Sequence, residues 1–232
     1  MEEDQMYDPN QPTGMNPGVG RLDVAGRQTS LLDAVLGWLA LSLVLTAGGV
    51  YGWEAMGLHL PWFVALVVMI ALIFGIQAAV RAGNTALGAS LFAAFAVAEG
   101  LFLAPVIDLY LRVNPAAVGN AVLGTAAIFV LCAGVVWVTN RSFAAWGKWL
   151  LGALLAGIVL IAISIFIPAI GIPQLLLDLF LGAVFVGLTL FDFWRVKAAR
   201  PGDDSALLIA LSLYLDFINL FLILLRLFGR RD

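Results

Sequence analysis

Cysteine, histidine and charged residues are all scarce in this chain of 232 residues. Cys132 is the single cysteine, so no intrachain disulfide can form. One histidine cannot build a zinc site or a His-based catalytic triad without partners, and the sequence groups none around it. The 12 Lys and Arg residues form no basic stripe, which argues against nucleic-acid binding. We therefore expect neither an enzyme nor a resident cofactor.

Hydrophobic residues, by contrast, make up 62% of the chain, and only 12% of its residues are charged. A soluble domain of this length cannot bury so much apolar surface, because small domains bury only part of what their chains expose. The composition predicts an all-α integral membrane protein whose main partner is the lipid bilayer.

Seven hydrophobic runs are long enough to cross a membrane, which takes about 20 mostly apolar residues. The breaks between them carry Pro, Asn and charged residues, as loops do. The predicted spans are 31–52, 61–80, 86–107, 116–138, 147–167, 173–194 and 204–228. Residues 1–30 are rich in Gly, Pro and acidic residues and are predicted to be a disordered cytoplasmic tail, which leaves 31–232 as the membrane domain.

The basic residues outside the spans predict the orientation of the chain. With the N-terminus in the cytoplasm, eight Lys and Arg residues up to residue 200 lie on the cytoplasmic side and only Arg112 lies on the other. The three arginines at the C-terminal end, Arg226, Arg230 and Arg231, do not fit this pattern if 204–228 crosses fully. Either that stretch crosses against the charge pattern, or it is re-entrant, or an earlier span is not a full crossing. The length of 204–228 favours seven crossings.

Four acidic residues lie well inside predicted spans: Glu99, Asp178, Asp192 and Asp216. A carboxylate at the centre of a bilayer costs about 3 kcal/mol on insertion scales, so each should face the protein interior or a water-filled cavity. Asp192 and Asp216 lie on consecutive antiparallel spans at similar depths, roughly 12 and 16 Å from the turn. Their side chains are therefore predicted to meet.

Two carboxylates in contact cannot both ionise at low cost, so the pair is expected to share a proton and to titrate as a unit. Loss of that proton would separate them or admit a hard cation such as Ca²⁺, which prefers oxygen ligands. Ser212, Asp216 and Asn219 follow the spacing i, i+4, i+7 and are predicted to share one helical face. The alternative is that each aspartate only hydrogen-bonds a neighbouring helix.

Three further residues are candidates for the same pathway or its control. Glu99 could extend an acidic path or pair with Arg81. Arg81 ends its span and is interpreted either as a positive-inside anchor or as a counter-charge to the aspartate pair. Asp178 lies near the far membrane surface, where an interfacial position is favoured over a place at the mouth of a cavity.

Three segments resemble a known family. "ALSLYLDFINLFLILLRLFG" (210–229) closely resembles the C-terminal signature of the transmembrane Bax inhibitor motif family. "GLTLFDFWRVK" (187–197) and "AAFAVAEGLFLAPVIDLY" (93–110) resemble two other segments of it, and the resemblance covers about residues 31–231. After Asp192 the sequence departs from the family pattern, because Phe-Trp-Arg replaces a small polar residue, Gln and a basic run.

This resemblance implies seven helices with the seventh at the centre. It also implies a pH-sensitive Ca²⁺ leak gated by Asp192 and Asp216, with Arg81 as the candidate latch. Two alternatives are a regulatory protein that binds another membrane protein, such as a quality-control protease, and an intramembrane aspartyl protease. The second lacks the G-x-G-D turn of such proteases around Asp216. We expect a bacterial inner-membrane protein. The resemblance implies that Ca²⁺ is the transported ion.

Overall fold

A computed structural model describes residues 17–56, 62–139, 141–199 and 206–230 of the chain. Seven long α-helices account for most of this part, and each contains a stretch long and apolar enough to cross a membrane. They are α1 (Pro17–Met56), α2 (Trp62–Arg81), α3 (Thr85–Val113), α4 (Pro115–Val138), α5 (Trp146–Phe166), α6 (Gln174–Ala198) and α7 (Ala206–Gly229), with the short 3₁₀ helix η1 (Pro168–Ile170) before α6. The predicted seven-helix membrane fold is confirmed.

Local sequence signals set several of the helix ends. The Asn84 side chain accepts a hydrogen bond from the backbone N–H of Leu87, and Asn114 does the same for Ala117, so each asparagine caps the helix that follows it. Pro115 then occupies the first turn of α4, where a missing N–H costs nothing. These short polar breaks make consecutive helices antiparallel.

The predicted tail of residues 1–30 overlaps the beginning of α1, which starts at Pro17. Residues 1–16 and the side chains of residues 17–30 lie outside the described part of the chain. The tail therefore stays a prediction.

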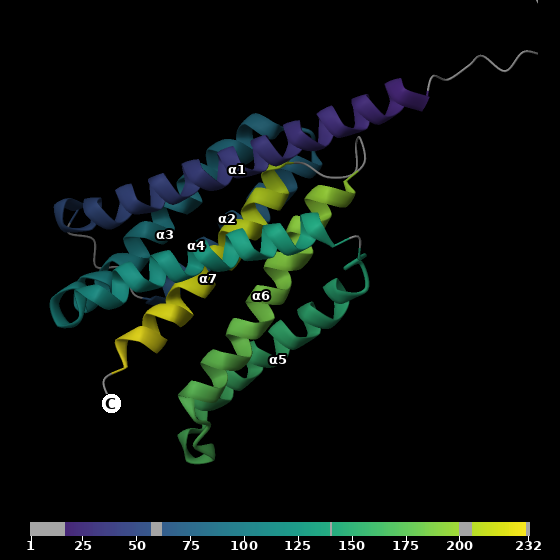
Figure 1. Cartoon of the computed structure of the whole chain (residues 1–232). Helices are drawn as coiled ribbons and strands as arrows, with labels where there is room; N and C mark the ends of the chain where they lie inside the picture. Colours follow the sequence, from purple (N-terminus) through teal and green to yellow (C-terminus); the bar gives the residue numbers. More distant parts are fainter. Residues whose placement is uncertain (1–16, 57–61, 140, 200–205, 231–232) are drawn as a thin grey trace, which may run out of the picture.

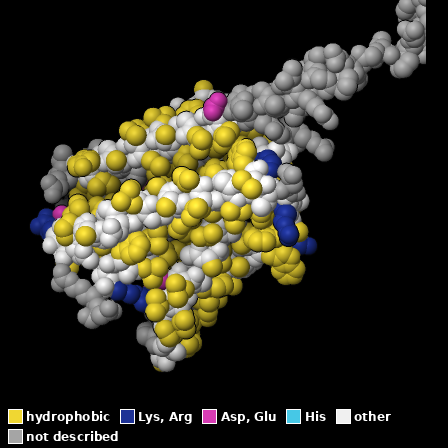
Figure 2. All heavy atoms as spheres, viewed as in Figure 1, with side chains coloured by type: hydrophobic (Ala, Val, Ile, Leu, Met, Phe, Trp, Pro, Cys, Tyr) yellow, Lys and Arg dark blue, Asp and Glu magenta, His cyan; other side chains and the backbone are white. Residues whose placement is uncertain are grey.

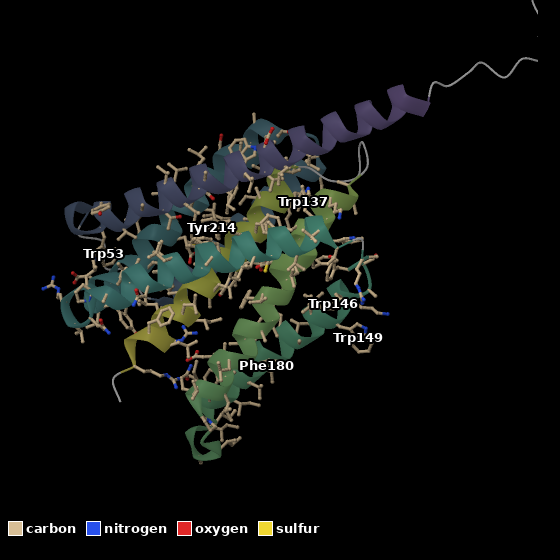
Figure 3. The ribbon with its side chains drawn as sticks, viewed as in Figure 1. Trp53, Trp137, Trp146, Trp149, Phe180 and Tyr214 are labelled. Atoms are coloured by element: carbon tan, nitrogen blue, oxygen red, sulfur yellow. The ribbon has the colours of Figure 1, made fainter. Side chains whose placement is uncertain are left out.

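Helix α7 runs between the other elements and packs against α1, α2, α3, α4 and α6 (Figure 1). It is the most buried of the spans, because 61% of its apolar stretch is buried inside the protein. Helix α5 packs on α6 at the edge, and only 6% of its apolar stretch is buried. The core is built around α7, where Tyr214 (labelled in Figure 3) makes edge-to-face contacts with Phe92 and Phe95 of α3.

Hydrophobic side chains cover most of the visible outer face, and Lys and Arg lie near its edges (Figure 2). An apolar exterior is what a surface in contact with lipid tails requires. We call the end of the bundle that carries Arg81 and Arg195 the inner end, and the end that carries Asp178 and Arg226 the outer end. The positive-inside pattern predicts that the inner end faces the cytoplasm.

Candidate functional site

Asp216 lies halfway along α7, with 4% of its surface exposed. The hydroxyl of Thr189 on α6 donates a 3.4 Å hydrogen bond to its Oδ2 atom. The carboxylate of Asp192, one turn further along α6, interacts with it electrostatically. Cys132 of α4 also lies within the field of Asp216. Asp192 and Asp216 thus lie on two helices that pack together, within electrostatic range of each other. The direct meeting of their side chains stays a prediction.

Asp192 is also buried, with 3% of its surface exposed. Nη1 of Arg195, three residues along the same helix, donates a 3.1 Å hydrogen bond to its Oδ1 atom. Arg195 ends the Phe-Trp-Arg segment that follows Asp192 in the sequence. Arg195 therefore links Asp192 to the inner end of the bundle.

A cavity of about 500 Å³, which we call the outer cavity, lies between α5, α6 and α7. Its lining includes Ser212, Asp216 and Asn219, which share one face of α7 because they follow the helical spacing. The Asn219 amide donates a 2.7 Å hydrogen bond to the carbonyl of Leu215, which fixes the orientation of its side chain. Leu and Ile side chains of α5 form the opposite wall. Arg226 also lines the cavity, about two helical turns beyond Asn219 on α7.

A second cavity of about 220 Å³, the inner cavity, lies between α2, α6 and α7. Gln77, Arg81 and Arg195 line it together with apolar residues of α7. Ser212 and Leu215 line both cavities, so the two cavities approach each other at these residues, which we call the partition. Asp216 follows Leu215 directly in the chain, which puts the carboxylate pair beside this partition.

Arg81 and Glu99 do not form a pair. The Nη2 atom of Arg81 donates a 3.4 Å hydrogen bond to Gln77, one turn back on α2. Glu99 lies half-buried on α3, where it interacts electrostatically with Tyr214, whose hydroxyl is 2.6 Å from the hydroxyl of Thr46. Glu99 is absent from the lining of both cavities within the described residues.

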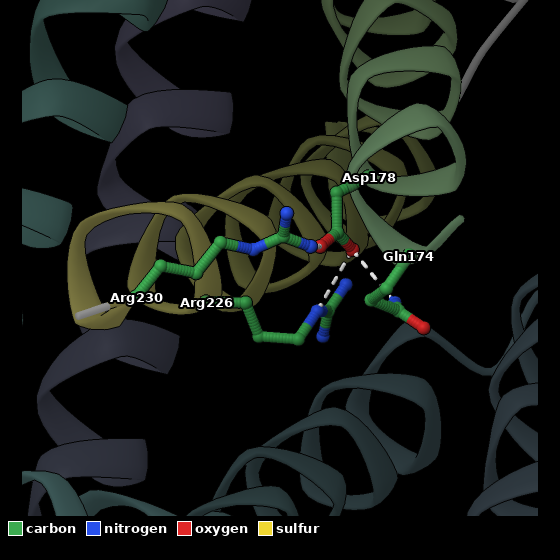
Figure 4. A network of polar contacts seen from close by, with 4 residues as sticks. All are labelled: Gln174, Asp178, Arg226 and Arg230. Carbon is green, nitrogen blue, oxygen red and sulfur yellow. Dashed lines mark hydrogen bonds and ion pairs between the residues drawn. The ribbon is translucent and has the colours of Figure 1, made fainter. Parts of the chain in front are cut away.

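The sequence favoured an interfacial position for Asp178, but the structure buries its side chain completely. Arg226 donates to its Oδ1 atom at 2.9 Å and Arg230 to its Oδ2 atom at 3.1 Å, while the Gln174 amide donates to Oδ1 at 3.1 Å (Figure 4). We call these four residues the outer cluster. The sequence held one signal for it, since the C-terminal arginines contradicted the positive-inside pattern and needed a partner.

The described residues contain no group of three or more His, Cys, Asp or Glu side chains that could hold a metal ion. Asp192 and Asp216 would therefore supply two acidic ligands, and hydroxyl or amide oxygens such as those of Thr189, Ser212 and Asn219 would have to supplement them.

Relatives of the chain are membrane proteins of bacteria. It is 27% identical to the inner membrane protein YbhL of Escherichia coli K12 over 227 residues, which covers 89% of this chain and 94% of YbhL. It is 32% identical to an uncharacterized membrane protein of Streptococcus pyogenes serotype M3 over 177 residues, with 74% and 75% of the two chains covered. An uncharacterized protein of Deinococcus radiodurans shares 29% identity over 212 residues, or 84% and 88% of the two chains.

None of these names gives an enzymatic activity. Together with the seven apolar helices, they place the chain in the bacterial inner membrane as a multi-pass protein. The family model described as "Inhibitor of apoptosis-promoting Bax1" matches residues 28–232, which include every described span. The chain belongs to this Bax inhibitor-like family of membrane proteins.

Proposed function

We propose that the chain conducts cations, Ca²⁺ in particular, passively across the inner membrane, and that Asp192 and Asp216 make this conduction depend on pH. The observation that carries the proposal is the position of Asp216. Its side chain is buried, interacts with Asp192, and lines the outer cavity beside the partition that separates it from the inner cavity.

The two cavities support a path that is closed at one level. The inner cavity reaches Ser212 and Leu215 from one end of the bundle, and the outer cavity continues from the same two residues toward Arg226. Asp216 and Arg226 are about 15 Å apart along the axis of α7. A small movement of α7 against α6 at Leu215 would join the two cavities into one passage.

The groups along this path have the chemistry that a hard cation requires. Ca²⁺ is bound by carboxylate, amide and hydroxyl oxygens, and Asp216, Asn219 and Ser212 present these on one face of α7. Intramembrane carboxylates are costly, and in transport proteins they mark ion pathways. Apart from Arg226, the remainder of the outer cavity lining is apolar, so a cation in it would depend on these few oxygens.

The proton enters the mechanism through the carboxylate pair. Two interacting carboxylates share a proton more readily than they carry two charges, and a cation competes with that proton for the same oxygens. Acid therefore lowers the occupancy of the pair by Ca²⁺, and alkali raises it. The charged and titratable groups around the pair include Arg195 on α6, which holds Asp192, and Cys132 on α4.

The test is Ca²⁺ flux into liposomes that contain the purified chain, measured from about pH 5 to about pH 8. The wild-type flux is expected to change with pH, and Asp216→Asn is expected to flatten the profile because the amide cannot exchange the shared proton. Asp192→Asn should act in the same way.

Asp108→Asn is the matched control, because Asp108 is an exposed acid on α3 that pairs with Arg112 and lines neither cavity. It should keep the wild-type profile. The proposal fails if the wild-type chain passes no Ca²⁺ at any pH, or if Asp216→Asn retains the wild-type response.

A further inference from the structure

The inner cavity carries two guanidinium groups that come from different helices. Arg81 ends α2 and Arg195 lies in the last turn of α6, and both line the cavity with the Gln77 amide and the Ser212 hydroxyl. None of its lining residues in the described part of the chain is acidic. Arg195 is paired with Asp192, whereas Arg81 has no acidic partner among the described residues. The lining therefore holds one unpaired positive charge, a second guanidinium group and two neutral polar groups, a combination that favours an anion.

Arg81 is poorly satisfied within the protein. Its hydrogen bond to the Gln77 side chain measures 3.4 Å and joins it to a neutral group, and the described residues give it no acidic partner. The Arg81 side chain is exposed, whereas the part-buried arginine contacts are shorter and reach carboxylates, as Arg195 does with Asp192 at 3.1 Å and Arg226 with Asp178 at 2.9 Å. Arg81 therefore holds an unneutralised charge on the wall of the cavity.

We propose that the inner cavity binds a phosphate group between Arg81 and Arg195. Guanidinium groups present N–H donors in a planar fork that matches the oxygens of phosphate, and two forks from separate helices can hold one phosphate from two sides. The Gln77 amide and the Ser212 hydroxyl can donate to its remaining oxygens.

The position of the cavity indicates where such a phosphate comes from. It opens between membrane-spanning helices at the end of the bundle that the positive-inside pattern places in the cytoplasm, and basic pockets of this kind bind the headgroups of anionic lipids. Ile73, Leu208 and Leu211 on the same lining provide apolar surface for the glycerol and upper acyl carbons. A free phosphate ion or a soluble phosphate ester has the same chemistry at the arginines and is the other source.

Phosphate binding at this site would affect the carboxylate pair through Arg195. Arg195 both lines the cavity and donates to Asp192, so a phosphate draws on the same guanidinium that holds the pair. It would also neutralise the positive charges that a cation meets on the inner side of the partition. This consequence rests on the proposed function, whereas the binding of phosphate does not.

The experiment measures binding and not flux, so that the two proposals can fail separately. The full chain is purified from membranes that contain equal amounts of phosphatidylglycerol and phosphatidylcholine, and the retained lipids are quantified by mass spectrometry. The wild-type chain is expected to retain phosphatidylglycerol in preference, and Arg81→Gln should lower that preference about tenfold, because a charge-assisted contact is lost.

Lys148→Gln is the matched control. Lys148 is another basic residue at the inner end, where it lies over the ring of Trp149 and outside the cavity. It should retain lipid as the wild type does. Arg81→Lys serves as a second variant that keeps the charge and loses the planar fork, and it should fall between the wild type and Arg81→Gln.

Equilibrium dialysis with inorganic phosphate distinguishes the two sources. Preferred retention of phosphatidylglycerol that is lost in Arg81→Gln supports a lipid headgroup. Phosphate binding that is lost in Arg81→Gln, without a preference between the lipids, supports a soluble phosphate. The proposal is overturned if the wild type shows neither behaviour, or if Arg81→Gln matches Lys148→Gln in both measurements.

Discussion

Gly49 and Gly100 face each other where α1 packs against α3. A Cβ atom on Gly49 would lie 3.1 Å from the Cα atom of Gly100, and one on Gly100 would lie 3.0 Å from the Cα atom of Gly49. Both positions also contact backbone carbonyl oxygens of the opposite helix, which cannot move aside as a side chain can. Small residues at such crossings let membrane helices approach closely, and close packing replaces the hydrophobic effect that is absent within lipid.

We expect Gly49→Ala to destabilise the fold by about 1–3 kcal/mol, because the added methyl group forces α1 away from α3. Gly48→Ala, one residue earlier, is the control, since nothing lies within 4 Å of a Cβ atom there. That change should be neutral or slightly stabilising, as alanine favours helix. Thermal unfolding in detergent measures both, and equal midpoints for the two variants would contradict the packing argument.

At the scale of elements, the outer cluster joins the first turns of α6 to the last turn of α7. Asp178 is fully buried, whereas the Arg226 and Arg230 side chains are 39% and 35% exposed. The carboxylate therefore depends on the two arginines and Gln174 for all of its stabilisation, while the arginines retain partial access to their surroundings. Removal of the acid leaves two like charges close together at the end of α7.

Asp178→Asn is expected to destabilise the chain by about 3 kcal/mol, because breaking a buried ion pair leaves its remaining charges uncompensated. Asp108→Asn removes an acid from an ion pair of similar length whose side chains are 70% and 49% exposed, and should cost under about 1 kcal/mol. Chemical or thermal unfolding of the two variants gives the comparison. Similar losses for both would show that burial of Asp178 adds nothing.

For the molecule as a whole, the outer cluster bears on how the chain crosses the membrane. Basic residues gather at the inner end, so arginines at the end of an outward-running α7 contradict the simple charge rule. Asp178 offsets part of their charge within the protein. The charge rule counts residues in loops and takes no account of such pairing between helices.

We therefore expect the C-terminus to lie on the side opposite the N-terminus. A reporter enzyme that is active only outside the cytoplasm, fused after Asp232, should be active in cells. The same reporter fused after Arg141, in the loop between α4 and α5, should be silent. Activity of the second fusion alone would reverse the predicted orientation, and silence of both would mean an even number of crossings.

Much of the fold could be predicted from the pattern of the chain. The predicted spans differ from the helices mainly at their ends, because α1, α3 and α6 extend by several residues past the apolar runs. Thr189 could have been found as well, since it precedes Asp192 by three residues and so lies on the same face of α6. The same spacing argument predicts Arg195 as the partner of Asp192, because it follows Asp192 by three residues on α6.

Other features of the site had no local signal. Asp178 meets Arg226 across 48 positions of sequence, and Arg81 shares a cavity with Arg195 across more than a hundred. Such meetings depend on how far each helix is rotated about its axis and shifted along its neighbour. Side-chain packing over the whole bundle decides both quantities, and no short stretch of sequence contains them.

The sequence by itself determined that this protein is a bundle of seven membrane-spanning helices with acidic residues inside it. The length of each apolar run must match the thickness of the bilayer, and that length can be counted directly in the sequence. Only the tertiary structure decided which charges are paired and which line a cavity. The reason is physical: a buried charge is stabilised by the few groups within hydrogen-bonding distance, and the packing of distant helices chooses those groups.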